Sequence, residues 1–155
     1  EAGLPVYAEC GGLMYLSRSL RWGDRSGAMV GLIPGDAVMG ERPVGRGYAI
    51  LRARRDTAQG LVAGSEFQAH EFHYSHLENL PPDLDYAYDV VRGHGLDGRH
   101  DGFVQGHLLA SYCHRRGTGP QGWIAPFLDL AQRCARRFGV QQFTDDCPCL
   151  HVFPP

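Results

Sequence analysis

Residues 5–16 read Pro-Val-Tyr-Ala-Glu-Cys-Gly-Gly-Leu-Met-Tyr-Leu. Residues 6–8 form a short apolar run that favours a β-strand. After Cys10 and two glycines, the apolar residues at 13–16 and Leu20 are spaced as on one face of a helix. The stretch therefore predicts a strand, a tight turn that carries a cysteine, and a helix.

Cys10 has the sequence surroundings of a nucleophile. A cysteine between a strand and a helix, followed by glycines, is the thiol counterpart of the nucleophile elbow, in which small neighbours permit a strained backbone. The positive end of the helix dipole would stabilise its thiolate, and the Gly11 amide would point to where an oxyanion forms. The alternative is a buried structural cysteine beside a Gly-Gly packing contact.

A thiolate nucleophile needs an imidazole to take and return a proton, and this partner can be distant in sequence. Residues 103–112 are mostly apolar and predict a strand, which runs into Cys113 and His114. Open α/β sheets place their sites at the carboxyl ends of strands. Among the eight histidines, His114 is therefore the best candidate for the base.

Composition limits the class of protein. The 155 residues and 43% hydrophobic content predict one compact domain. The 15 basic residues are all arginine, scattered among 17 acids, so nucleic acid is not an expected partner. No apolar run approaches the roughly 20 residues that span a bilayer, and five cysteines are too few for a secreted scaffold, so we expect a cytoplasmic protein with reduced thiols and no membrane contact.

The remaining elements are predicted from short patterns. Between Trp22 and Gly64, Gly-rich and Pro-rich sequence with apolar bursts predicts antiparallel strands and turns. Further strands are expected at 71–75 and 86–91, and a helix at 123–138. We assign 1–139 to the folded domain and 140–155 to an irregular tail.

That tail contains Cys147, Cys149 and His151, which are residue types that bind zinc. The one-residue spacing of the thiols is tighter than usual and a fourth ligand is missing, so no metal site is predicted. Glu71 and His73 are two residues apart and share one face of a strand. They either contact the site together or hydrogen-bond to one another, whereas Glu9 is expected to point away from the thiol and brace the turn.

Three stretches together resemble a known family. They are residues 5–16, His-Glu-Phe-His-Tyr-Ser at 70–75, and Ala-Ser-Tyr-Cys-His at 110–114. In this order they are similar to the signatures of the glutaminase domain of cobyrinic acid a,c-diamide synthases. The resemblance implies an α/β fold of the class I glutamine amidotransferase type, a mixed sheet flanked by helices. It also implies Cys10 as nucleophile, His114 as general base and acid, and a site-adjacent role for Glu71 and His73.

The resemblance further implies an activity. Glutamine would be hydrolysed, and its ammonia would be passed to a synthetase domain that uses ATP and Mg²⁺ to amidate the a and c carboxylates of cobyrinic acid in cobalamin biosynthesis. That domain would hold the tetrapyrrole; this chain has no P-loop string and is expected to bind no cofactor. A homo-oligomer is expected. The alternatives are a hydrogenobyrinate or nickel-sirohydrochlorin a,c-diamide synthase, or a catalytically silent interaction module.

The sequence departs from the family pattern in ways that limit the assignment. Class I glutaminases usually carry a glutamate two residues after the catalytic histidine, and the cobyrinate branch commonly carries a second histidine. This chain has Arg116 there, so no third triad member is assigned. The family's upstream glycine-rich strand, which supplies part of the oxyanion hole, has no counterpart here. We therefore expect the N-terminal part of the domain to be missing and the isolated chain to be weakly active or inactive.

Overall fold

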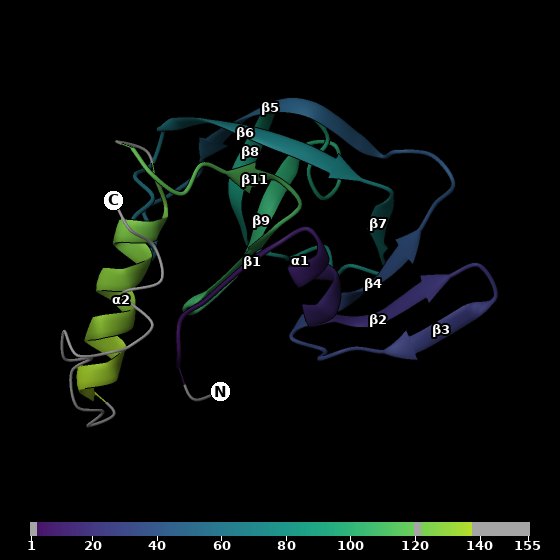
Figure 1. The fold of residues 1–155 in the computed structure, drawn as a ribbon, viewed down its shortest axis with the longest axis horizontal. Helices are drawn as coiled ribbons and strands as arrows, with labels where there is room; N and C mark the ends of the chain where they lie inside the picture. Colours follow the sequence, from purple (N-terminus) through teal and green to yellow (C-terminus); the bar gives the residue numbers. More distant parts are fainter. Residues whose placement is uncertain (1–2, 120–121, 138–155) are drawn as a thin grey trace, which may run out of the picture.

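The computed structural model of the chain, described here for residues 3–119 and 122–137, contains two sheets (Figure 1). The larger one is a seven-stranded mixed sheet in which β1 and β10 pair in parallel and the other neighbours are antiparallel. Its strands in spatial order are β1 (Val6–Glu9), β10 (Leu108–Ser111), β9 (His100–Gln105), β8 (Tyr86–Arg92), β5 (Gly45–Ala53), β6 (Glu66–His73) and β11 (His114–Arg115).

The second sheet is four-stranded and lies beside α1 (Gly11–Leu16), as Figure 1 shows. In spatial order it contains β3 (Arg25–Ala28), β2 (Ser17–Trp22), β4 (Ile33–Met39) and β7 (Ser75–Glu78). The chain passes from α1 directly into β2, and β6 leads almost directly into β7. The predicted class, a mixed sheet combined with helices, is confirmed.

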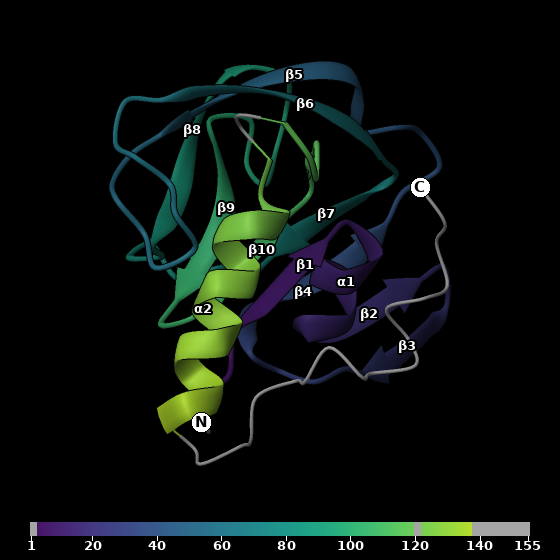
Figure 2. The same ribbon diagram turned by 60° about the vertical axis from the view of Figure 1, so that its left-hand side comes forward.

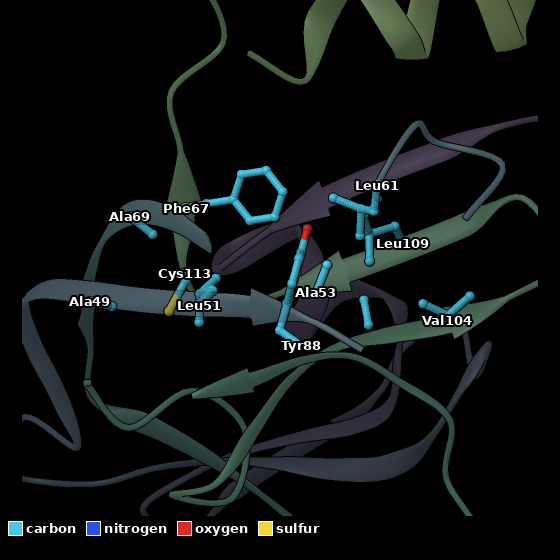
Figure 3. Packing of buried hydrophobic residues seen from close by; sticks show 11 residues of the cluster. Ala49, Leu51, Ala53, Leu61, Phe67, Ala69, Tyr88, Val104, Leu109 and Cys113 are labelled. Atoms are coloured by element: carbon cyan, nitrogen blue, oxygen red, sulfur yellow. The ribbon is translucent and has the colours of Figure 1, made fainter. Parts of the chain in front are cut away.

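Two apolar clusters hold the larger sheet. One is centred on Tyr88, which is fully buried and lies among Phe67, Ala53 and Leu109 in Figure 3. The other includes Leu13 of α1 and packs that helix against β10. The long helix α2 (Ile124–Arg137) crosses in front of β9 and β10 in Figure 2.

Aromatic contacts attach α2 to the sheet. The rings of Tyr7 and Trp123 are stacked with centroids 4.0 Å apart, and Phe127 meets Tyr7 edge-on. Cys134 is buried on the same helix. None of the helices within the described ranges is long and apolar enough to cross a membrane.

Three local predictions were wrong. Leu20 continues no helix, because α1 ends at Leu16 and Leu20 pairs with Ala37 inside β2. Residues 103–112 form two strands rather than one, because Gly106 at φ 58° turns the chain between β9 and β10. The strands between Trp22 and Gly64 are not all antiparallel, because β4 pairs in parallel with β2. The case of Leu20 arises because an apolar run fits either a strand or a buried helix face, and tertiary pairing decides between them.

Candidate active site

Cys10 lies on a strained turn between β1 and α1. Its backbone has φ 47° and ψ −101°, a left-handed φ that side chains other than glycine rarely adopt. Such a conformation costs about 1–3 kcal/mol and persists where the surroundings over-determine it. Here the Cys10 N–H donates to Ser111 O at 2.8 Å, and Met14 N–H donates to Cys10 O at 3.1 Å. The turn has the form of a nucleophile elbow.

Gly12, two residues after Cys10, makes this turn compact. A Cβ on Gly12 would lie 3.2 Å from the Cβ of Ala8, so a larger residue would push α1 away from β1. Gly11, by contrast, has open space around the position of a Cβ. Gly11 contributes its backbone N–H, which contacts the Cys10 thiol and favours its anionic form. That amide is the predicted oxyanion donor.

The Cys10 thiol is half-buried, and its Sγ lies 4.0 Å from the carbonyl oxygen of Phe72. Burial raises its pKa, the Gly11 amide lowers it, and the Glu9 carboxylate raises it again, with a net increase. The prediction of a thiolate stabilised by a helix dipole and an imidazole is therefore wrong. α1 has only six residues, and in the described ranges no hydrogen bond joins Cys10 to an imidazole. The raised pKa favours the thiol over the thiolate.

This protonation state predicts how the thiols react with iodoacetamide. Cys10 should be alkylated faster than Cys113 and Cys134, because they are buried at 0% and 5% exposure and burial also raises the pKa of Cys113. Since only the thiolate reacts, the Cys10 rate should be below that of a free cysteine at pH 7 and still rise between about pH 8 and 9. Timed labelling with peptide mass spectrometry measures both. A Cys10 rate that levels off below pH 7 would contradict the raised pKa.

His114 reaches the same region from a different strand. It lies in β11, where it is the partner of His70 on β6, and Phe72 follows two residues further along β6. Two residues of a strand span about 7 Å, so Cys10 and His114 approach neighbouring points of one strand edge. Figure 1 shows the β1–α1 junction below β11. Catalytic hydrogen bonds are often long in unliganded sites and tighten when substrate binds.

The side chain of His114 contacts Glu9. Its Nδ1 lies 3.0 Å from Glu9 Oε2, while the Glu9 Oε1 accepts hydrogen bonds from the Arg115 N–H at 2.9 Å and the Tyr7 hydroxyl at 2.7 Å. Sequence reasoning assigned Glu9 to the turn and missed this contact. No local pattern could have revealed it, because the paired residues are 105 positions apart.

Glu71 and His73 are on the buried face of β6, as their spacing predicts, with 2% and 3% exposure. His73 Nε2 is 3.6 Å from Glu71 Oε2, which is an ion-pair distance rather than a hydrogen bond. Burial raises the pKa of the Glu71 carboxyl, but His73 and the N–H groups of Gly95 and His94 outweigh it and lower this pKa to about 2. Glu71 thus anchors the turn after β8.

His73 supports the segment that leads to His114. Its ring stacks on Tyr112 with centroids 4.0 Å apart and an interplanar angle of 10°. Its Nδ1 lies 2.7 Å from Ser75 O, a backbone acceptor, so that nitrogen is the donor. His73, together with Glu71, therefore packs against the segment that precedes His114.

Asp101 is a site residue that sequence reasoning missed. It is completely buried, and its carboxylate accepts hydrogen bonds from Ser111 Oγ and from the N–H groups of Tyr112 and Cys113. It thereby shapes the turn between β10 and β11 and delivers His114 to the strand edge. No sequence pattern marked Asp101, because it follows Arg99 and His100 and precedes the apolar run that begins at Phe103.

Two further features could form sites. A cavity of about 640 Å³ opens beside His114 between β6 and the loop after β11, but Cys10 does not line it, so glutamine is not placed there. Among the residues that the structure describes, no group of three or more His, Cys, Asp and Glu side chains is arranged to hold a metal. Cys147, Cys149 and His151 lie outside the described residues.

Comparisons with known proteins agree on the family. A family profile described as a CobB/CobQ-like glutamine amidotransferase domain matches residues 1–118. The cobyrinate a,c-diamide synthase of Magnetococcus marinus is 41% identical over 128 residues, covering 83% of this chain and 27% of that protein. The protein of the same name from Haloarcula marismortui is 43% identical over 116 residues, 74% of this chain and 26% of that protein. The chain thus spans about a quarter of these relatives.

A solved structure supports the fold. The crystal structure of a GMP synthase-type protein from Thermoplasma acidophilum superposes with a TM-score of 0.55 and 16% sequence identity. The match covers 88% of this chain and 60% of that one. At this identity the likeness concerns the fold alone.

Proposed function

The chain belongs to the family of CobB/CobQ-like glutamine amidotransferase domains, and from that premise we propose that it is the glutaminase portion of an ATP-dependent amidotransferase. The acceptor in this proposal is cobyrinate, whose a and c carboxylates are amidated in cobalamin biosynthesis. The observation that carries the glutaminase role is Cys10 on a strained strand-to-helix turn, with His114 brought to the same strand edge. The acceptor is supported by the names of the relatives.

The proposed reaction begins with a neutral thiol, so a base is needed. His114 takes the Cys10 proton as Sγ attacks the side-chain amide carbon of glutamine, and the Gly11 N–H stabilises the tetrahedral oxyanion. The C–N bond breaks as His114 returns the proton to the leaving nitrogen, which departs as ammonia. Water then attacks the thioester and gives up a proton to His114, and Cys10 leaves as the thiol with glutamate released.

The other parts of the proposal concern the whole protein. ATP and Mg²⁺ are assigned to a synthetase domain and no cofactor to this chain. Within the described residues the Gly11 amide is the one oxyanion donor that we assign, and loss of a single donor typically costs about 10²- to 10³-fold in turnover. We therefore propose that the 155-residue chain by itself hydrolyses glutamine slowly. The expected homo-oligomer stays a prediction.

The acceptor can be tested with isotope-labelled glutamine. The complete natural protein, given ATP, Mg²⁺ and amide-¹⁵N glutamine, should convert cobyrinate to a product that carries ¹⁵N in both new amides, measured by mass spectrometry. Hydrogenobyrinate and nickel sirohydrochlorin serve as competing acceptors under the same conditions. Preferential labelling of either competitor would replace cobyrinate as the substrate, and glutamine left intact with every acceptor would indicate a silent module.

A further inference from the structure

The tautomer of His114 follows from its hydrogen bond to Glu9. Nδ1 of the imidazole lies 3.0 Å from Glu9 Oε2. An ionised carboxylate only accepts hydrogen bonds, so Nδ1 is the nitrogen that carries the proton. In the neutral ring Nε2 is then the unprotonated nitrogen, and it is the one available to accept a proton from a thiol. The Glu9 contact therefore selects the tautomer that a general base requires.

Other hydrogen bonds fix the Glu9 carboxylate. Tyr7 OH and Arg115 N–H both donate to Oε1, at 2.7 and 2.9 Å, which leaves Oε2 for His114. The Glu9 carboxylate thus binds the His114 ring and the Arg115 N–H at the same time. Glu9 itself is fixed by the parallel pairing of β1 with β10, in which Glu9 lies opposite Ser111. The carboxylate that meets the His114 ring is therefore held in place by the pairing of β1 with β10.

The described part of the chain offers no other carboxylate for this role. Glu71 is engaged by the N–H groups of Gly95 and His94, and Asp101 by the turn before His114. The residue two positions after His114 is Arg116, which is exposed. Glu9 also directly precedes Cys10, so one short segment supplies both a nucleophile and an acid.

We propose that Glu9 is the positioning residue that orients His114 and keeps its Nε2 free to act as the base. The proposal rests on the proposed glutaminase function. Its physical basis is that of a histidine held by a buried or partly buried acid, where loss of the charge permits the wrong tautomer. Glu9 lies at the end of β1, directly before Cys10, and contacts His114 from there. An acid that orients the histidine can therefore precede it in the sequence.

The test uses Glu9→Gln in the complete natural protein. An amide keeps the shape of the side chain but can present an N–H to Nδ1, so kcat for glutamine hydrolysis should fall by on the order of a hundredfold or more. KM should stay within about threefold, because Glu9 acts on the base and not on substrate binding. Amidation with added ammonia should stay at the parental rate, and Glu9→Asp should restore part of the lost kcat.

The matched control is Glu78→Gln, which removes another Glu–His contact, that of Glu78 Oε1 with His76 Nε2 at 3.1 Å, and should leave glutamine hydrolysis unchanged. A Glu9→Gln kcat within about twofold of the parent would overturn the proposal. So would a parallel loss of ammonia-driven amidation, which marks Glu9 as merely structural. Nitrogen NMR of ¹⁵N-histidine in the parental protein is independent of turnover: a proton on Nδ1 of His114 supports the proposal even if glutaminase activity is absent, and a proton on Nε2 alone refutes it.

Discussion

Cys10→Ser in the complete natural protein should abolish amidation that uses glutamine and leave amidation driven by added ammonia intact. Loss of a catalytic nucleophile costs on the order of 10⁴-fold or more in turnover, because a serine hydroxyl is a far weaker nucleophile than a thiol when the base is tuned to sulfur. Ammonia added to the solution enters after the step that needs Cys10. Product formation with each nitrogen source, measured by liquid chromatography, separates the two activities.

Cys134→Ser is the matched control for this substitution. Cys134 is a buried thiol in α2 that contacts His107 Nδ1 at 3.4 Å, away from the turn at Cys10. The Cys134→Ser variant should retain both the glutamine-driven and the ammonia-driven amidation. If the Cys10→Ser variant used glutamine at the parental rate, the assignment of Cys10 as the nucleophile would be wrong. Loss of the ammonia-driven activity as well would make Cys10 a structural residue.

Asp101→Ala should give the largest loss of stability among single changes near the site. The substitution leaves the N–H groups of Gly102 and Tyr112 without their acceptor in a fully buried position. The Cys113 N–H and the Ser111 hydroxyl lose the carboxylate but keep acceptors in Ser111 Oγ and Cys113 O. Each buried group left unsatisfied costs about 1–3 kcal/mol, so for these two N–H groups we expect a total loss of about 2–6 kcal/mol in the free energy of unfolding. That is a large part of the roughly 5–15 kcal/mol of a typical domain.

Urea titration of the parent and the variant measures this difference through the transition midpoint. Asp89→Ala is the control, because Asp89 is a half-exposed acid on β8 that pairs with Arg54 at 2.8 Å, and such surface pairs contribute less than about 1 kcal/mol. Asp101→Asn retains one acceptor oxygen and should lie between the two. If Asp101→Ala unfolded at the midpoint of Asp89→Ala, the carboxylate would not be what holds the turn before His114.

The candidate active site could be predicted where its geometry is local. Two glycines after Cys10 and the apolar run before it specify a strained turn within a few residues, and the structure has that turn. The spacing of Glu71 and His73 likewise predicted a shared face, because side chains alternate along any strand. These inferences required only local backbone geometry and no knowledge of which distant residues come into contact.

The rest depended on which strands pair. Burial of the Cys10 thiol, with Glu9 beside it, raises a pKa that sequence reasoning expected to fall. The hairpin at Gly106 and the pairing of β1 with β10 place Glu9 opposite Ser111, and only then does its carboxylate meet His114. Sequence alone determined the family, the turn and the candidate nucleophile and base. The tertiary structure decided how Glu9 and Asp101 hold the histidine, because electrostatics and hydrogen bonding act between neighbours in space, whatever their separation along the chain.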